Sequence, residues 1–428
     1  MRVPFSRTAP GPIMAEGTPK TDLNVLVIGG GPAGLMAAIA AASNGARVAV
    51  CERNDQPGLK LLATGGGRCN LTNTAPADEF MAAFGRHGRF IQPALAAMDG
   101  EGLRAFFDGL GVPTFCEDGF HVYPRSNRAR DVRDALVRRC GELGVTIITG
   151  ARVTALITDG GAVKGVETPA GPVLAPRVII TTGGKSYAEL GSTGDGYAMA
   201  AAVGHTIAPL VPALVGLVTR QRWPAEIAGV SIPAVRVWID LPGQPKAGKK
   251  GDILFTHTGV SGPAVLDISG DVAELLAKRK EVPIRIDLSP GAGRAQWRQR
   301  LDDWGHGKGW RAIGSHLAAH VPSSVAGVLC RLAGIDAELP AAEVSRAARN
   351  TLANLVTGLP LTITATEGFD HAMVTRGGVA LKEVDPRTLA SKIIRGLYFA
   401  GEALDLDGPC GGYNLQWALS SGHLAGLN

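Results

Sequence analysis

Three glycines near the start of the chain have the spacing that a bound dinucleotide requires. Gly29, Gly31 and Gly34 form the pattern G-x-G-x-x-G. The first glycine permits a tight turn, the second lets the backbone approach a pyrophosphate, and the third allows a helix to pack closely on a strand. The helix that follows offers free N–H groups and a partial positive charge. Further along, the carboxylate of Glu52 can accept hydrogen bonds from a ribose diol.

The segments around these residues have the order that such a site needs. Residues 24–28 form a short β-branched run that predicts a buried strand, and residues 32–43 are rich in Ala, Leu and Met and predict a helix. Residues 47–52 predict a second strand, so the three segments form a βαβ unit with parallel strands. The acidic Glu52 disfavours a 2′-phosphate, which predicts FAD or NAD(H) rather than NADP(H).

Two further glycine-rich segments favour FAD. Residues 59–73 contain three consecutive glycines followed by Arg68, Cys69 and Asn70, which places polar groups beside a very accessible backbone. Residues 411–417, Gly-Gly-Tyr-Asn-Leu-Gln-Trp, precede the last predicted helix. N–H groups at that helix start suit the N1/C2=O edge of a flavin, where reduction places negative charge. We therefore expect the two segments to meet at the flavin ring.

The overall composition is that of a globular protein with unusually many turns. The chain has 428 residues with 58 glycines, and its 43 Lys and Arg against 38 Asp and Glu give a net charge of +5. No run of basic residues is typical of a nucleic-acid-binding arm. The six cysteines show no CxxC spacing, which predicts reduced thiols and no metal site. Without a signal-like or membrane-spanning segment, we expect a cytoplasmic protein.

Beyond residue 205 the pattern changes. Short strands with prolines follow one another up to residue 290, a helical Arg/Trp/Ala-rich stretch runs from 291 to 356, and residues 396–428 again predict strand, glycine-rich loop and helix. The end of the chain therefore completes the first domain. The predicted α/β organisation is a flexible N-terminal extension over 1–20, a Rossmann-like FAD-binding domain over 21–205 plus 376–428, an inserted β domain over 206–290 plus 357–375, and a helical subdomain over 291–356.

Five motifs, in order along almost the whole chain, resemble those of the BaiN-like NAD(P)/FAD-dependent oxidoreductases. This family includes enzymes named aminoacetone oxidases and belongs to the glutathione-reductase-like flavoproteins. The motifs are VLVIGGGPAGLMAA (25–38), GLKLLATGGGRCNLTN (58–73), LFTHTGVSGPAVLDIS (254–269), GGVALKEVD (377–385) and GLYFAGEALDLDGPCGGYNLQWALSSGHLAG (396–426). The resemblance implies an FAD-binding domain built from both chain ends, with an inserted β-barrel-like unit and a helical piece.

The resemblance also implies which residues hold the cofactor. The ADP half would lie at the first glycine motif and Glu52, and the flavin at the two later glycine-rich segments. The implied cofactor-binding residues are Gly29, Gly31, Pro32, Ala33, Gly34, Glu52, Arg53, Lys60, Gly67, Arg68, Cys69, Asn70, Val153, Thr182, Gly183, Gly401, Glu402, Gly412, Tyr413, Asn414 and Leu415. Arg376 and Cys410 depart from the residues expected in this family and alter the pocket's expected shape and charge.

No residue pattern identifies the catalytic group. His257 is a candidate acid or base, although a histidine at a strand end is more often structural. Cys69 and Cys410 are candidates for a redox pair, although small residues packed against a ring are the commoner case. Tyr123 and Tyr413 are candidates to line a substrate pocket, and a packed, half-buried tyrosine is an equal alternative.

These patterns predict an FAD-dependent oxidoreductase. It would transfer hydride or electrons between a small organic substrate and a nicotinamide, oxygen or a quinone-like partner, with the substrate entering between the FAD domain and the inserted unit. Because no second G-x-G-x-x-G exists, NAD(P)H would bind only transiently. The alternatives are a flavoprotein acting on nucleic acid, such as a tRNA-modifying enzyme, and a non-catalytic redox sensor. The modest net charge argues against a nucleic-acid partner, and no membrane partner is expected.

Overall fold

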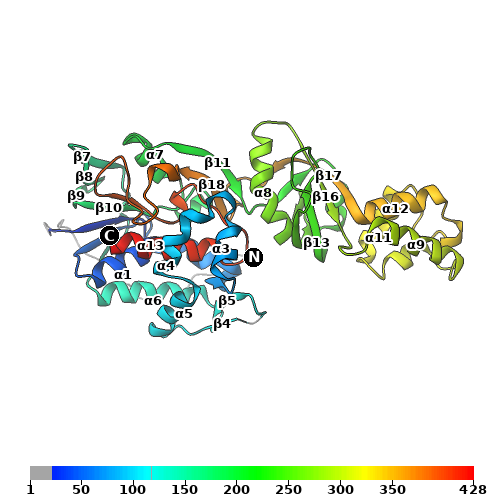
Figure 1. The fold of residues 1–428 in the computed structure, drawn as a ribbon, viewed down its shortest axis with the longest axis horizontal. Coiled ribbons are helices and arrows are strands. Elements are labelled where there is room, and N and C mark those ends of the chain that lie inside the picture. Colours follow the sequence, from blue (N-terminus) through cyan, green and yellow to red (C-terminus); the bar gives the residue numbers. More distant parts are fainter. Residues whose placement is uncertain (1–21, 117) are drawn as a thin grey trace.

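The computed structural model describes residues 22–116 and 118–428, and the predicted extension over 1–20 lies outside them. The molecule is elongated, with three units in a row (Figure 1). A Rossmann-type α/β domain lies at one end, a closed six-stranded barrel in the middle, and a group of helices at the other end. This architecture confirms the predicted fold class.

A five-stranded parallel sheet forms the centre of the first domain. Its order is β19-β10-β1-β2-β6, with β1 in the middle. The strands are β1 (Val25–Ile28), β2 (Val48–Cys51), β6 (Thr146–Ile148), β10 (Arg177–Ile180) and β19 (Leu397–Phe399). Every residue of β1 and β2 is buried, as their β-branched and apolar composition requires. Because β19 pairs with β10, a strand from the last 32 residues of the chain completes the sheet.

Helices α1 (Pro32–Ser43) and α13 (Tyr413–Leu427) lie side by side against this sheet (Figure 1). Glycines make their close contact necessary. A Cβ atom on Gly422 would lie 2.2 Å from the carbonyl oxygen of Ala33, and one on Gly426 would lie 2.3 Å from that of Ala37. The two helices therefore run parallel with their backbones almost touching. Nine residues of α13 precede Gly422 and one residue of α1 precedes Ala33, so α13 begins about 12 Å before α1 along their common direction.

Smaller elements surround the sheet. Strands β7 (Ala155–Asp159), β8 (Ala162–Thr168) and β9 (Gly171–Leu174) form an antiparallel sheet, and β3 (Thr72–Asn73), β5 (His121–Pro124) and β4 (Thr114–Cys116) form another in the order β3-β5-β4. The remaining helices of this domain are α2 (Leu59–Ala63), α3 (Ala77–Ala83), α4 (Gln92–Ala97), α5 (Gly100–Gly109), α6 (Ala129–Glu142) and α7 (Asp195–Ala202).

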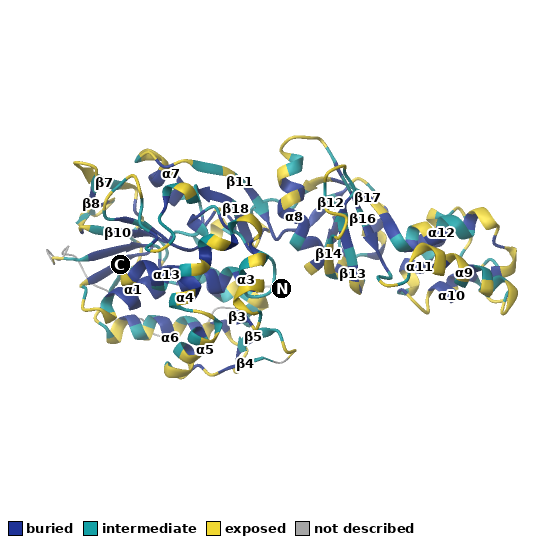
Figure 2. Cartoon of the chain, in the orientation of Figure 1, coloured by how far each residue is buried: buried dark blue, intermediate teal, exposed yellow. Residues whose placement is uncertain are grey.

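The barrel and the helical end share one hydrophobic core. The barrel strands, in closed order, are β12 (Leu217–Thr219), β15 (Gly259–Ser261), β14 (Lys249–Phe255), β13 (Ser231–Ile239), β16 (Val282–Asp287) and β17 (Leu359–Thr366). The helices beyond them are α9 (Arg294–His306), α10 (Ile313–Leu317), α11 (Ser323–Leu332) and α12 (Arg346–Gly358). Buried Phe255 and Ile284 of the barrel belong to the same cluster as Trp297 and Leu352 of the helices, and Figure 2 shows this buried interior. We therefore expect these two units to unfold together.

Two antiparallel strands, β11 (Ile207–Ala213) and β18 (Val374–Val379), connect the Rossmann-type domain with the barrel. Helix α8 (Pro263–Leu276) lies against both β11 and the barrel. A small apolar cluster of Ala213, Leu214, Leu266 and Val374, with Cys410 packed against it, fills the junction. Among residues 22–116 and 118–428, no helix has the length and apolar character needed to cross a membrane.

Candidate functional site

A pocket opens at the carboxyl ends of the parallel strands. Its lining includes Ile28 and Cys51, the last residues of β1 and β2, together with Thr181 and Ala400, which directly follow β10 and β19. Ligands of open α/β sheets bind at this edge. The lining also reaches from Glu52 after β2, past Gly31 at the start of α1, to Asn414 at the start of α13. A long ligand such as a dinucleotide suits a pocket that extends over these elements.

The three motif glycines have different roles. A Cβ on Gly29, whose φ is +101°, would lie 2.8 Å from the carbonyl oxygen of Thr181, and a Cβ on Gly34 would lie 1.9 Å from that of Gly29. Both glycines are therefore required by the fold itself. A Cβ on Gly31 would meet no atom within 4 Å, and Gly31 lines the pocket at the start of α1. The open space at Gly31 thus fits an approaching phosphate.

Glu52 is held rigidly beside this loop. Its side chain is only 7% exposed; Oε2 accepts the N–H of Gly30 at 2.7 Å and Oε1 accepts the N–H of Asn54 at 2.8 Å. An ionised carboxylate can accept about four hydrogen bonds. Each oxygen therefore keeps capacity for a ribose hydroxyl.

An ionic cluster that the sequence analysis did not identify lies next to Glu52. Asp195 accepts hydrogen bonds from Arg152 Nε at 3.0 Å and from Thr193 at 2.9 Å, and Arg53 contacts both Asp195 and Thr193. Burial by itself would raise the pKa of Asp195, but these hydrogen bonds and the positive charges of Arg152 and Arg53 lower it overall. The glycine-rich run over 191–196 was the available signal, since such runs often mark backbone-approach loops. All four side chains line the pocket.

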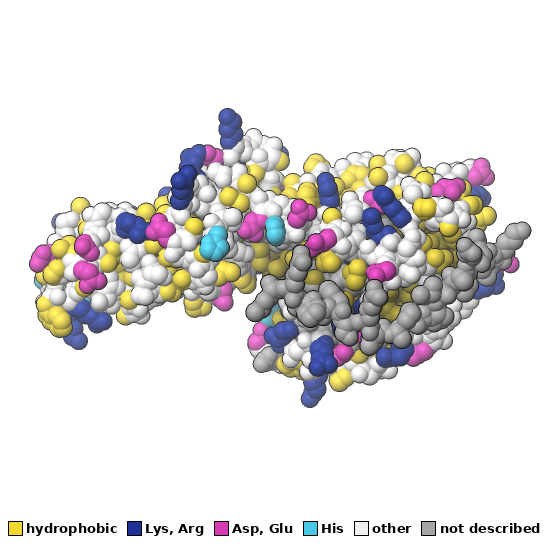
Figure 3. All heavy atoms as spheres, turned by 180° about the vertical axis from the view of Figure 1, so that it is seen from behind, with side chains coloured by type: hydrophobic (Ala, Val, Ile, Leu, Met, Phe, Trp, Pro, Cys, Tyr) yellow, Lys and Arg dark blue, Asp and Glu magenta, His cyan; other side chains and the backbone are white. Residues whose placement is uncertain are grey.

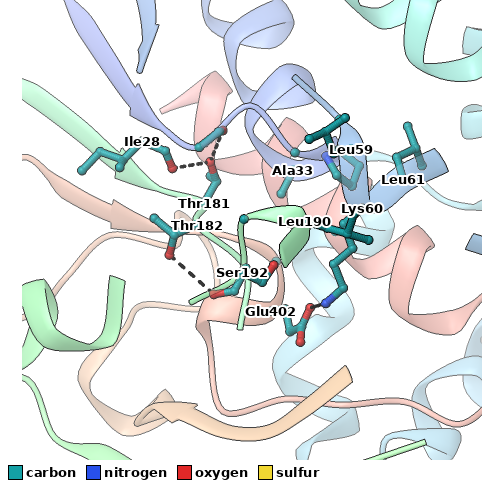
Figure 4. A pocket seen from close by; sticks show the side chains of 18 of the residues that line it. Ile28, Ala33, Leu59, Lys60, Leu61, Thr181, Thr182, Leu190, Ser192 and Glu402 are labelled. Atoms are coloured by element: carbon teal, nitrogen blue, oxygen red, sulfur yellow. Dashed lines mark hydrogen bonds and ion pairs between the residues drawn. The ribbon is translucent and has the colours of Figure 1, made fainter. Parts of the chain in front are cut away.

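Lys60 and Glu402 form an ion pair across the pocket (Figure 4). Lys60 Nζ lies 2.8 Å from Glu402 Oε2, and the other oxygen, Oε1, accepts the N–H of Thr375 at 2.8 Å and the hydroxyl of Ser186 at 3.2 Å. Both charged side chains are about one-fifth exposed. This network joins α2 to the loop after β19 and leaves donor and acceptor groups along the pocket wall.

The two glycine-rich segments predicted to hold the flavin contact each other. Asn73 Nδ2 donates to the carbonyl oxygen of Gly411 at 2.8 Å. In the amide orientation that satisfies its neighbours, Asn70 accepts the N–H of Gly412 at 3.1 Å and donates to Thr72. These bonds tie residues 70–73 to the start of α13. Because α13 begins about 12 Å before the start of α1, the two helix N-termini are spaced to serve different parts of one extended ligand.

The pocket collects most of the predicted cofactor-binding residues. Those that line it are Gly29, Gly31, Pro32, Ala33, Glu52, Arg53, Lys60, Val153, Thr182, Gly183, Gly401, Glu402, Asn414 and Leu415. Those that do not line it are Gly34, Gly67, Arg68, Cys69, Asn70, Gly412 and Tyr413. The assignment of both groups to the cofactor stays a prediction.

The candidate catalytic residues lie outside the pocket lining. Cys69 is fully buried, and burial raises the pKa of its thiol to about 12, which disfavours a reactive thiolate. Burial likewise raises the pKa of Cys410, and all six cysteines are free. His257 is exposed in the turn between β14 and β15. Their roles in catalysis stay untested predictions.

The fold and the pocket together define the class of protein. A glycine cradle at a helix start, a carboxylate held for a ribose, and a second helix start further along one pocket fit the diphosphate, sugar and ring of FAD. When bound, FAD supplies two-electron redox chemistry. The chain is an FAD-dependent oxidoreductase.

The chain belongs to the family described as HI0933-like protein Rossmann domain, whose model matches residues 23–428. It is 40% identical over 407 residues to a 3-dehydro-bile acid delta(4,6)-reductase of Clostridium scindens, covering 94% of this chain and 97% of that protein. It is 29% identical over 412 residues to a ribosomal RNA dihydrouridine synthase of Escherichia coli, covering 93% and 96%. The resemblance to BaiN-like oxidoreductases is thereby confirmed.

Solved structures share the fold at low sequence identity. A 3-ketosteroid delta1-dehydrogenase from Sterolibacterium denitrificans superposes with a TM-score of 0.51 at 14% identity, over 95% of this chain and 98% of that one. A 3-ketosteroid-delta4-(5alpha)-dehydrogenase from Rhodococcus jostii gives 0.50 at 18% identity, over 95% and 96%. At these identities the likenesses establish the fold alone.

Proposed function

We propose that the protein reduces a carbon–carbon double bond conjugated to a carbonyl group in a ring-shaped organic substrate, with a nicotinamide as electron donor. The observation that carries this proposal is the 40% identity to a 3-dehydro-bile acid delta(4,6)-reductase over nearly the full length of both chains. That name describes a substrate with a ketone conjugated to ring double bonds.

A second relative supports the same class of reaction. Dihydrouridine is uridine with a saturated ring double bond, and that bond is conjugated to a ring carbonyl group. This chain is 29% identical, over 93% of its length, to a ribosomal RNA dihydrouridine synthase. The name of that relative therefore also describes the reduction of a conjugated double bond. Two relatives with very different substrates thus agree on the bond that is reduced.

The residues of this chain supply binding and orientation. Gly31 and the start of α1 would hold the diphosphate of FAD, and Glu52 would bind its ribose. The Lys60–Glu402 pair would lie along the ribityl chain that connects the diphosphate to the flavin ring. The two segments at Asn70 and Gly412 would fix the ring end. Substrate would enter at the junction with the barrel, because ligand sites favour domain interfaces.

Anaerobic half-reactions test this proposal. The purified yellow protein is mixed with NADH or NADPH, and flavin bleaching is followed by absorbance. The reduced protein is then mixed with a 3-dehydro-Δ4,6 bile acid, with oxygen or with a quinone. We expect bleaching by one of the two nicotinamides and fastest reoxidation by the bile acid. Reoxidation by oxygen or quinone alone would contradict the proposal.

Ribosomal RNA is the second candidate substrate, favoured by the similarity to dihydrouridine synthases. Its binding would require a basic surface. On the described part of the face shown in Figure 3, Lys and Arg side chains are scattered among acidic and apolar ones. Retention on RNA that falls steeply with salt, together with new dihydrouridine in ribosomal RNA, would favour this candidate.

A further inference from the structure

Tyr413 occupies a special position at the junction of the pocket and the barrel. It is the first residue of α13, directly after Gly411 and Gly412, and is 9% exposed. Its ring is fixed by three aromatic neighbours, with centroid distances of 4.7 Å to Phe80, 6.1 Å to Phe84 and 6.4 Å to Phe120. The direction of its hydroxyl is therefore set by packing.

The hydroxyl of Tyr413 has no hydrogen-bond partner among the described residues. The Tyr413 hydroxyl oxygen is not one of the fully buried polar atoms that lack a hydrogen-bond partner. It therefore keeps some solvent-accessible surface. Buried tyrosines usually find a partner for this group. An unpaired hydroxyl on an immobilised ring is available to a ligand.

Glycines keep the surroundings of this phenol open. A Cβ on Gly411 would lie 3.3 Å from Phe120, 3.5 Å from His121 Nε2 and 3.6 Å from the Tyr413 ring. A Cβ on Gly408 would lie 2.8 Å from Tyr413 Cβ. A side chain at either position would crowd Tyr413. Because Gly411 has no side chain, space remains between the Tyr413 ring and β5.

Two carboxylates on other elements act electrostatically on the phenol, Asp267 of α8 and Glu79 of α3. Asp267 also accepts the N–H of Cys410 at 2.8 Å, which brings α8 up to the loop before Tyr413. Burial first, and then the charges of Asp267 and Glu79, raise the pKa of Tyr413. His121 of β5 lies at the same opening and is paired with Asp118. Because the pKa of Tyr413 is raised above its ordinary value, the phenol stays protonated at neutral pH.

The pocket ends next to this group. Asn414 and Leu415, the two residues after Tyr413, line it, and so does Val374. Val374 lies in the junction cluster with Leu266 of α8, against which Cys410 packs. Tyr413 therefore lies where the ring end of the cofactor pocket meets the barrel.

We propose that Tyr413 is the proton-donating residue of the reduction, a role that rests on the proposed function. FAD, when bound and reduced by the nicotinamide donor, would supply a hydride to the β-carbon of the conjugated ketone. The π bond breaks, and the Tyr413 O–H bond breaks as its proton forms the new C–H bond at the α-carbon. The product is the saturated ketone, and solvent returns a proton to the phenolate.

Tyr413→Phe tests this role because it keeps the aromatic packing and removes only the hydroxyl. Tyr398→Phe is the matched control, because Tyr398 does not line the pocket and its hydroxyl donates to the carbonyl oxygen of Asn428. We expect Tyr413→Phe to retain its FAD and to be bleached by the nicotinamide within twofold of the wild type. Its reoxidation by a 3-dehydro-Δ4,6 bile acid should be about 100-fold slower or more. The control should match the wild type in both steps.

The outcomes separate the two proposals. If the reduced wild type is not reoxidised by the bile acid, the proposed function is wrong and the role of Tyr413 falls with it. If the wild type reacts and Tyr413→Phe reacts equally fast, only the role of Tyr413 is overturned. The rate should also fall at high pH in the wild type, as the phenol ionises, and this fall should be missing in the variant.

A titration without turnover provides an independent readout. The phenolate absorbance of the wild type should include one tyrosine that ionises at unusually high pH and is missing from Tyr413→Phe. Asp267→Asn should shift this ionisation to lower pH, because it removes a neighbouring negative charge. If the ionisation missing from Tyr413→Phe is instead that of an ordinary exposed tyrosine, at about pH 10, the phenol is not held in the buried site and the proposal is overturned.

Discussion

The ammonium nitrogen of Lys60 lies 2.8 Å from a carboxylate oxygen of Glu402, although 342 positions separate the two residues. This contact joins the start of the chain to its end across the cofactor pocket. Because Thr375 and Ser186 bind the other oxygen of Glu402, the carboxylate is fixed in one orientation. The pair therefore sets both the shape and the charge of the pocket between the two helix starts.

Replacing Lys60 by methionine should weaken cofactor binding more than folding. The pair is partly exposed, so its loss should cost only about 1 kcal/mol of the free energy of unfolding. The unpaired Glu402 would then repel the cofactor's phosphates, and FAD affinity should fall about tenfold. Urea unfolding and FAD titration by fluorescence measure the two effects. Lys164→Met, at an exposed position on β8, is the control, and equal FAD affinity in both variants would contradict the prediction.

Alanine substitutions should separate the folding role of Gly34 from the binding role of Gly31. Gly34→Ala places a Cβ 1.9 Å from a backbone oxygen and should lower the free energy of unfolding by about 3 kcal/mol. Gly31→Ala meets open space and should leave the unfolding midpoint of the cofactor-free protein almost unchanged. It should still reduce FAD affinity at least about tenfold by filling the phosphate cradle. A Gly31→Ala protein with normal affinity would show that the phosphate lies elsewhere.

The features predicted correctly from the sequence are those with local causes. The βαβ unit over residues 24–52 follows from short-range apolar patterns and glycine spacing, and the structure contains β1, α1 and β2 there. The α/β class and the inserted barrel were available from motifs spread along the chain. The exact domain boundaries stay a prediction, because β11 and β18 join the two units as one continuous connection.

The features that escaped prediction depend on distant partners. Arg53 meets Asp195 across 142 positions, and no local pattern indicates that pairing. A proline at the end of a strand is typical of an edge strand, yet β5, which ends at Pro124, lies between β3 and β4. The reason is that β3 pairs only with His121 and Val122, so the missing N–H of Pro124 falls beyond its reach. The open hydroxyl of Tyr413 likewise results from tertiary packing.

His205 should make stability depend on pH below neutrality. Its side chain is fully buried, with Nε2 2.8 Å from Ser391 Oγ and Nδ1 3.4 Å from Glu383. Burial lowers the pKa of His205, although Glu383 opposes this shift. The folded state therefore binds a proton less readily than the unfolded chain, and stability is lost as pH falls below about 6.5.

His205→Gln should remove this pH dependence. At pH 7.5 the variant should be less stable by about 1 kcal/mol, because it loses a hydrogen bond and the ring contact with Phe399. Between about pH 6.5 and 5 the wild type should lose up to about 1.4 kcal/mol per pH unit through His205, so the gap should close. Urea unfolding at several pH values measures this. His371→Gln, at an exposed position, should keep the wild-type slope, and parallel slopes for all three proteins would contradict the prediction.

Arg376 should be the strongest single charge contact between the Rossmann-type domain and α8. Its Nε and Nη2 donate to Asp407 at 3.0 and 3.1 Å, and Nη1 donates to Asp271 of α8 at 2.6 Å. Gly270 leaves room for the guanidinium, since a Cβ there would lie 2.6 Å from its Cζ. This arrangement accommodates an arginine where the family resemblance predicts another residue.

Asp407 and Asp271 should respond differently to the loss of this arginine. Asp407 is 14% exposed and Asp271 is 52% exposed, so only Asp407 would become a largely buried, unpaired carboxylate. Arg376→Met should therefore cost about 3 kcal/mol of the free energy of unfolding, whereas Asp271→Asn should cost less than about 1 kcal/mol. Adding Asp407→Leu to Arg376→Met should recover most of the loss, because the stranded charge is removed together with its partner. Urea unfolding of the three variants measures these differences, and a double variant no more stable than Arg376→Met would show that packing at Gly270, rather than the ion pair, holds the two domains together.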